Sequence, residues 1–274
     1  MAQEGAELQR VTLQGTLSDV LEDTLRLNID AIGLRQLSGL LGNDHPFGGR
    51  MNGEINVTGM KEPVVTGSVT VDALALDDRV LGDFEAFSLY TPGSPDIALV
   101  ARVTPTIVRD QDSTENRVNV TGAFRLPGQD DAGSIDLAVD VPHADAFFLK
   151  YVIDAFSDVQ GLFTGTGYVR GSFDHPIFGG DFSYLAGSLR IPIYNLLFAV
   201  EGDVRVDEEG IHIDSLTLTD RTGGTANIAG TVFFNDYRHL SFDLAGDLDR
   251  VQICLLYTSP SPRDRTRSRM PSSA

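Results

Sequence analysis

The stretch V-R-V-D-E-E-G-I-H-I, residues 204–213, shows most clearly how this chain folds. Apolar and polar residues alternate on both sides of a short acidic turn that ends in glycine. A period of two places successive side chains on opposite faces of a strand, and a glycine-containing turn between two such runs is typical of a β-hairpin. We therefore predict a hairpin here, with one apolar face and one polar face.

Similar alternation occurs along most of the 274 residues, and the composition agrees with it, since Gly is abundant at 28 and Trp is absent. The clearest other runs lie at residues 25–29, 55–57, 69–71, 118–120, 137–141, 216–218, 232–234 and 240–244. Alternation of this kind indicates half-buried strands. The sequence therefore predicts a mainly β protein.

Two short stretches break the period of two and have helical spacing instead. The stronger one contains Phe147, Phe148, Tyr151, Val152, Ala155 and Phe156, with Pro142 and Asp145 suited to its start. The weaker one contains Leu34, Leu37, Leu40 and Leu41 and is interrupted by glycine. We predict a short helix at each, with loops that carry apolar anchors as the alternative.

Each predicted helix belongs to a longer pattern that occurs twice, with an offset of 112 or 113 residues. The matched structural positions are Gly53 with Gly165, Gly59 with Gly171, Pro63 with Pro176, and Gly67 with Gly180. The repeat divides the chain into preceding strands (1–24), unit 1 (25–134), unit 2 (135–239), the start of a third unit (240–253) and a tail (254–274).

The tail differs from the rest of the chain. From Cys254 onward, a Ser/Pro/Arg-rich run resembles the translation of a sequencing adapter, and we interpret it as an artefactual, disordered segment. It holds four of the 21 basic and one of the 39 acidic residues, so 17 minus 38 leaves a net charge of −21 for the remainder. Such a charge argues against nucleic acid as a partner. The tail also holds the only Cys, so cysteine usage does not decide the redox compartment.

The sequence carries no recognisable catalytic motif, and we predict a protein that is not an enzyme, with no metal and no cofactor. The five histidines have no metal-ligand spacing with one another, and the acidic turns D-E-E-G and Q-D-D-A-G lack the spacing of a calcium loop. Asp174 and His175 form a tempting pair, but the first copy of the repeat has Lys61 and Glu62 there. We therefore interpret that segment as structural.

The first ten residues have neither the basic nor the apolar region of a signal peptide, and no uncharged apolar run in the sequence is long enough to span a membrane. The first alternating residues, Val11 and Leu13, come directly after these ten residues. We therefore expect an internal piece of a longer protein.

The pattern G-x-V-x-G-x-x-x-x-P-x-x-G-G at Gly167–Gly180 is followed by A-G-S-L-R-I-P and by D-S-L-T-L-T-D-R-T-G-G-T-A-N-I-A-G-T-V-F. These residues resemble the C-terminal conserved region of the TamB-like translocation and assembly module family, within the AsmA-like group. The resemblance is best over residues 135–248 and weaker over residues 25–128.

The resemblance implies a long, curved, antiparallel-rich sheet built from repeats and curled into an apolar groove, with a short helix in each repeat. It implies a periplasmic protein tethered to the inner membrane, which holds phospholipid acyl chains and works with an outer-membrane barrel protein of the TamA type. Phospholipid transport and assembly of outer-membrane proteins are the functions that it implies.

An apolar sheet face needs a cover, which acyl chains could supply. The candidate groove-lining positions are Ile55, Val57, Val69, Val71, Val204, Val206, Ile211, Ile213, Leu216 and Leu218. Ordinary core packing is the alternative for each of them. The alternative for the whole protein is an adhesive or structural surface protein made of tandem β-sandwich modules, since each unit has the size of an immunoglobulin-like domain.

Overall fold

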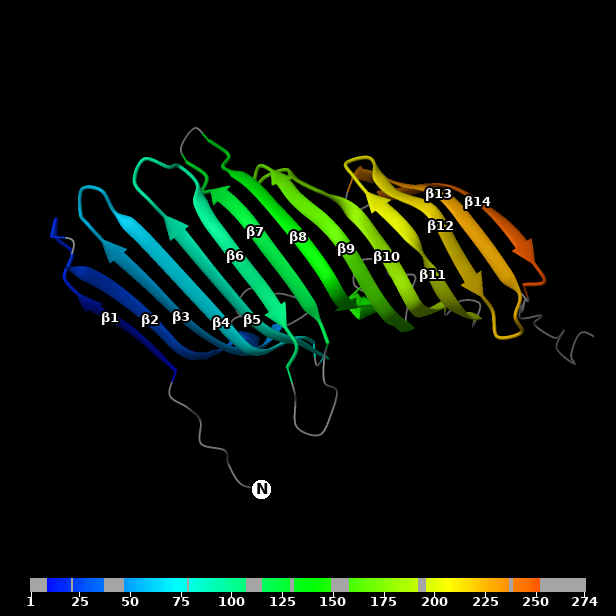
Figure 1. Cartoon of the computed structure of the whole chain (residues 1–274), viewed down its shortest axis with the longest axis horizontal. Coiled ribbons are helices and arrows are strands. Elements are labelled where there is room, and N and C mark those ends of the chain that lie inside the picture. The colour runs from blue at the N-terminus through cyan, green and yellow to red at the C-terminus, as the bar shows by residue number, and fades with distance from the viewer. Residues whose placement is uncertain are drawn as a thin grey trace, which may run out of the picture.

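The structure, a computed structural model, describes residues 9–20, 22–36, 47–77, 79–106, 115–128, 131–148, 158–191, 196–236 and 239–251. The strands in these residues form one antiparallel sheet of 14 strands, in which every strand pairs with its neighbour in sequence (Figure 1). The prediction of a mainly β protein is confirmed. The single sheet also differs from a tandem β-sandwich, which would need pairs of sheets packed face to face.

The strands run across the sheet in chain order, with β1 and β14 at its two edges. They are β1 (Arg10–Gly15), β2 (Thr24–Gly33), β3 (Phe47–Thr58), β4 (Val64–Leu76), β5 (Arg79–Tyr90), β6 (Ile97–Thr104), β7 (Arg117–Arg125), β8 (Ser134–Asp145), β9 (Asp158–Gly171), β10 (Pro176–Ile191), β11 (Leu196–Val206), β12 (Gly210–Thr219), β13 (Thr225–Asp236) and β14 (His239–Asp249). A 3₁₀ turn, η1 (Ala146–Phe148), follows β8.

The hairpin predicted from residues 204–213 is present as β11, its turn and β12. Val204 lies opposite Ile213 and Val206 opposite Ile211, while Arg205 lies opposite His212. Directly opposed residues in an antiparallel pair point to the same face. The hairpin therefore separates apolar from polar side chains as its sequence predicts.

The two predicted helices lie largely outside the described residues. Residues 34–36 are helical, but 37–46 are not described. Ala146–Phe148 is a 3₁₀ turn rather than an α-helix, and the rest of that prediction, residues 149–156, is not described either.

Several strands contain a β-bulge that keeps apolar side chains on one face. In β2 the bulge falls between Ile29 and Ile32, and in β4 it falls between Val71 and Leu74. Ala31 and Ala73, the extra residues, have positive φ angles of 56° and 50°. Their N–H groups donate to the side chains opposite them, at 2.9 Å from Asn52 Oδ1 and 2.8 Å from Asp83 Oδ1. A side chain thus replaces the ladder partner that each bulge removes.

Asn116 joins two strands that are not neighbours in the sheet. Its side-chain amide donates to the carbonyl of Leu81 in β5 at 2.8 Å, and its Oδ1 accepts the N–H of Asp145 in β8 at 2.7 Å. Arg79 reinforces this link, because its guanidinium pairs with the Asp145 carboxylate and lies 4.5 Å from the centre of the Phe147 ring. Asn116 is only 6% exposed, so its hydrogen bonds are shielded from water.

We expect Asn116→Ala to lower the free energy of unfolding by about 2 kcal/mol, because it removes both hydrogen bonds made by a buried side chain. Asn119→Ala is the matched control. Asn119 is exposed and makes a single 3.2 Å hydrogen bond to Asp140, so its loss should cost about 0.5 kcal/mol or less. Urea unfolding followed by circular dichroism measures both, and equal losses would contradict this role of Asn116.

A cluster of buried residues lies at one end of strands β9–β13. It consists of Ala146, Val159, Tyr184, Leu189, Phe198, Val200, Leu218 and Ala226. Tyr184 sits beside the β10 bulge, and its hydroxyl donates to the carbonyl of Gln160 at 2.6 Å. Burial and the nearby charge of Asp145 raise the pKa of Tyr184 from 10.0 to about 12.

We expect Tyr184→Phe to cost about 1 kcal/mol of stability below pH 10, because the hydrogen bond to Gln160 is lost. The raised pKa means that the unfolded chain releases the Tyr184 proton more readily than the folded one. The stability of the parent protein relative to Tyr184→Phe should therefore fall as the pH rises from 10 to about 12. Unfolding both proteins in urea across this range is the measurement, and a difference independent of pH would show that Tyr184 is not buried in this way.

Candidate functional site

The apolar face of the sheet is the side that carries Val204 and Ile213. One row of directly opposed residues crosses this face, with one residue from every strand, and each member is aliphatic, phenylalanine or glycine. In sheet order the row is Val11, Ile29, Gly53, Val69, Ala86, Ala101, Val120, Val139, Gly167, Gly180, Val206, Ile211, Val232 and Phe242. We call it the apolar row.

The neighbouring row on the opposite face is polar throughout from β3 to β14. It consists of Asn52, Thr70, Glu85, Arg102, Asn119, Asp140, Thr166, Asp181, Arg205, His212, Thr231 and Asp243. We call it the polar row. A shift of one residue along almost any strand thus exchanges an apolar surface for a hydrated one.

Register places all ten predicted lining positions on the apolar face. Val69, Val206 and Ile211 belong to the apolar row itself. The other seven lie in β3, β4, β11 and β12, on the same face as the row. Val71 is 4% exposed and Leu218 is 9% exposed, whereas Ile55 is 38% exposed. The positions thus range from core to open surface along a single face.

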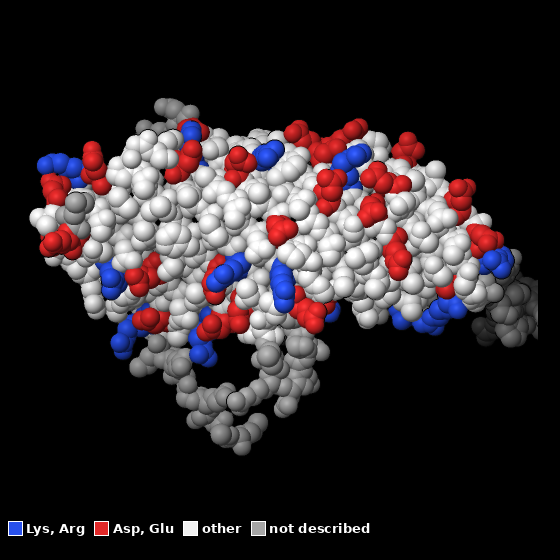
Figure 2. Space-filling model, in the orientation of Figure 1, with Lys and Arg blue, Asp and Glu red and all other residues white. Residues whose placement is uncertain are grey.

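The polar face carries exposed ion pairs between neighbouring strands. Arg102 contacts Glu85 at 2.6 Å, and Arg170 contacts Asp136 at 3.1 Å. Figure 2 shows acidic groups spread along the length of the sheet, with basic groups beside several of them. Pairs as exposed as these add little stability, but they keep this face hydrated.

The apolar face is covered unevenly. In the part of the chain that the structure describes, no second sheet lies over it, although Ala146 packs into the cluster near β9–β13. Toward the edge strands the apolar side chains are open, since Val11 and Leu13 are 60% and 64% exposed and Phe242 and Leu248 are each 65% exposed. A large apolar surface that lacks a cover is typical of a binding surface.

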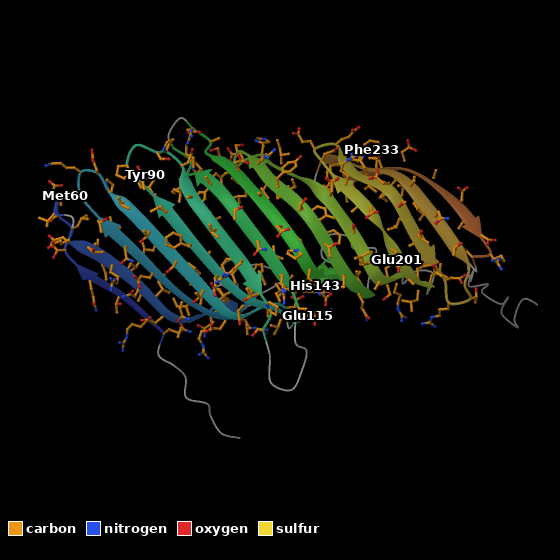
Figure 3. The ribbon with its side chains drawn as sticks, in the orientation of Figure 1. Met60, Tyr90, Glu115, His143, Glu201 and Phe233 are labelled. Atoms are coloured by element: carbon orange, nitrogen blue, oxygen red, sulfur yellow. The ribbon has the colours of Figure 1, made fainter. Side chains whose placement is uncertain are left out.

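A pocket of about 520 Å³ opens at the ends of strands β4 to β7. Its lining residues are Val65, Ser88, Tyr90, Pro95, Ile97, Phe124, Arg125 and Leu126. Tyr90, labelled in Figure 3, ends β5, and Arg125 at the pocket is held by Asp96 at 2.8 Å. The volume falls in the range of small-molecule sites, and Val65, Ile97 and Phe124 belong to the apolar face.

Glycines beneath aromatic rings shape the apolar face in β9 and β10. The ring of Phe182 lies over Gly165, Gly167 and Gly180, and side chains at these positions would collide with it. Phe163 stacks on Phe182 with ring centres 5.0 Å apart. The sequence pattern singled out Gly165 and Gly180 as structural, but it did not show that their function is to accommodate a ring.

The two copies of the Gly/Pro pattern occupy corresponding places in the sheet. Gly53 and Gly165 lie within β3 and β9, and Gly67 and Gly180 lie within β4 and β10. Gly59 and Gly171 precede the turns that lead to Pro63 and Pro176, and both have positive φ, of 77° and 102°. These turns therefore need a residue that adopts this conformation without strain.

We expect Gly171→Ala to lower the free energy of unfolding by about 1 to 3 kcal/mol, because φ is 102° and the new Cβ would lie 2.7 Å from the carbonyl oxygen of His175. Gly53→Ala is the control. Its Cβ would meet nothing closer than 3.4 Å, so the change should be within about 0.5 kcal/mol. Urea unfolding of the two variants tests this, and a larger loss for Gly53→Ala would refute it.

Asp174 and His175 lie exposed in the β9–β10 turn, where the His175 N–H donates to Ser172 Oγ at 3.1 Å. A different histidine, His143, faces Glu115 at 3.8 Å (Figure 3). Among the described residues, neither pair belongs to a group of three side chains that could hold a metal ion. His45 lies outside the described residues, as does the side chain of His239.

Comparisons with protein-family models, with curated proteins and with solved structures each found no match. In the residues that the structure describes, no helix is long and apolar enough to cross a bilayer. The two-faced sheet is therefore the feature from which a function has to be inferred.

Proposed function

We propose that this chain is a segment of a TamB/AsmA-like, periplasm-spanning protein that shields acyl chains of phospholipids in a groove lined by the apolar face. In this proposal the parent protein is tethered to the inner membrane and works with an outer-membrane barrel of the TamA type. It serves phospholipid transport to the outer membrane and protein assembly there. The observation that carries the proposal is the uninterrupted apolar row across all 14 strands.

An acyl chain is a suitable cover for such a row. Each buried CH₂ group contributes about 0.8 kcal/mol, so a chain that leaves water for the apolar face is stabilised along its whole length. The row contains no charged or hydrogen-bonding side chain. A sliding chain would therefore meet no site at which a polar group has to lose its water without compensation.

The dimensions support movement along the sheet. Neighbouring strands lie about 4.8 Å apart, so 14 strands extend the row over roughly 60 Å. Curling of the sheet around the apolar face would bring the polar row to the outside. The acidic net charge of the chain would then face water on the outer surface, away from the acyl chains.

Site-specific photo-crosslinking in cells tests this proposal with pairs of adjacent residues. We expect a benzophenone side chain at Val69 or Val204 to capture phospholipid, because both belong to the apolar face. Crosslinkers at Thr70 and Arg205, one residue further on in the polar row, should capture little.

The pairs control for chance contact with membranes, because Thr70 and Arg205 are the more exposed member of each pair. Non-specific adsorption would label them at least as strongly as Val69 and Val204. Equal labelling of both members, or labelling of the polar row alone, would overturn the proposal.

A further inference from the structure

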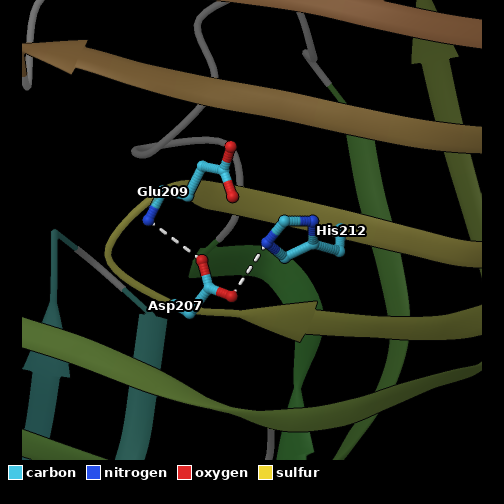
Figure 4. Close-up of side chains that lie close together, drawn as sticks. All are labelled: Asp207, Glu209 and His212. Atoms are coloured by element: carbon cyan, nitrogen blue, oxygen red, sulfur yellow. Dashed lines mark hydrogen bonds and ion pairs between the residues drawn. The ribbon is translucent and has the colours of Figure 1, made fainter.

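A cluster of three metal-ligating side chains lies at the turn between β11 and β12, away from the apolar face. Asp207, Glu209 and His212 each offer a ligand atom, and these three atoms lie within 4.8 Å of one another (Figure 4). His212 belongs to the polar row. The cluster is thus separate from the surface proposed to hold acyl chains.

The backbone of the turn holds the Asp207 carboxylate in place. Its Oδ1 accepts the N–H groups of Glu209 at 2.9 Å and of Gly210 at 3.3 Å. The turn itself is tied to β13, because the N–H of Phe234 donates to the carbonyl of Glu209 at 3.0 Å. With Oδ1 used in this way, Oδ2 faces the imidazole of His212, 2.9 Å from Nε2.

His212 presents Nε2 to the cluster because its other ring nitrogen is already engaged. Nδ1 lies 3.2 Å from Oγ1 of Thr231 on β13. Nε2 is shielded from solvent, and Asp207 Oδ2 is its partner at 2.9 Å. When Nδ1 donates to Thr231, Nε2 is the ring nitrogen left to bind an ion, and both carboxylates lie beside it.

An imidazole nitrogen and two carboxylates whose ligand atoms lie within 4.8 Å of one another can together hold a cation. The geometry points to a binding site for a divalent transition-metal ion of the zinc class, with His212 Nε2, an Asp207 oxygen and a Glu209 oxygen as ligands. Thr231 would act as the outer partner that fixes the imidazole, an arrangement common around metal-bound histidines. The imidazole favours zinc, cobalt or nickel over calcium and magnesium, which prefer sites made of oxygen alone.

The three ligands differ in how firmly they are held. His212 and Asp207 are fixed by Thr231 and by the turn N–H groups, whereas Glu209 is exposed and can rotate toward the ion. Water would fill the remaining positions of a four-coordinate ion. A bound ion would join the turn to β12, so its effect would be to stabilise this hairpin on the polar face of the sheet.

Titration of the tag-free chain with Co²⁺, followed by its visible absorption, and with Zn²⁺, followed by calorimetry, tests the site. Cys254→Ser serves as the parent, because it removes the only thiol as a competing ligand. We expect one ion per chain with a dissociation constant in roughly the micromolar range, and a rise in melting temperature on adding Zn²⁺.

Three variants separate this site from adventitious binding. His212→Gln should weaken binding by about tenfold or more and remove the thermal shift, and Thr231→Val should weaken it by about tenfold without removing a ligand. His175→Gln, which removes the histidine beside Asp174, should change nothing, because no third ligand lies near it in the described residues. Circular dichroism checks that each variant keeps its sheet.

Saturation at 100 μM Zn²⁺ by the parent and not by His212→Gln supports the site. Failure of the parent to bind at that concentration, or equal binding by His212→Gln and the parent, overturns it. Should His212→Gln not fold, the comparison of Thr231→Val with His175→Gln decides, since only the former contacts the cluster.

Discussion

An in-phase register between successive strands is the constraint on which the rest of this structure depends. Because side chains alternate with a period of two, a slip of one residue in a single pairing would exchange apolar and polar side chains on every strand beyond it. The bulges at Ala31, Ala73 and Ala186 belong to the same constraint. They fall where two apolar residues, such as Ile29 and Ile32, are separated by an odd number of positions, and the extra residue restores the phase.

The glycines and aromatic rings determine the local shape of the two faces that this register creates. Phe182 lies over three glycines on the apolar face, and Tyr168 lies over Gly179 on the polar face, with Arg170 4.6 Å from the centre of its ring. Glycine in a strand normally weakens it, since it offers no side chain to pack. Here the adjacent rings supply the missing contacts, so a glycine-rich segment still forms the longest strands of the sheet.

The sequence predicted what depends on neighbours along the chain. The β11–β12 hairpin followed from ten residues, and the alternating runs lie within strands of the structure. Alternation, however, does not specify which residues of distant strands face each other, so the apolar row became visible only with the register. The His212 cluster was not predicted for a related reason. Its three ligands come from one turn and the following strand, but Thr231, which holds Nδ1 of the imidazole, lies in β13. Asn116 likewise joins β5 to β8 through contacts that no local pattern encodes.

Strict chain order within the sheet has a consequence for how the molecule folds and how it can vary. Each strand pairs only with the ones before and after it, and the longest connection, between Gly33 and Phe47, has 13 residues, so each step closes a loop of limited length. Such a chain behaves as a nearly one-dimensional array, in which stability is a sum of single-strand terms and nearest-neighbour interfaces. Folding can start at any hairpin and then add neighbouring strands one at a time. Insertion or deletion of a whole hairpin preserves the phase of all the others, so the length of the sheet is free to change without redesign of its faces.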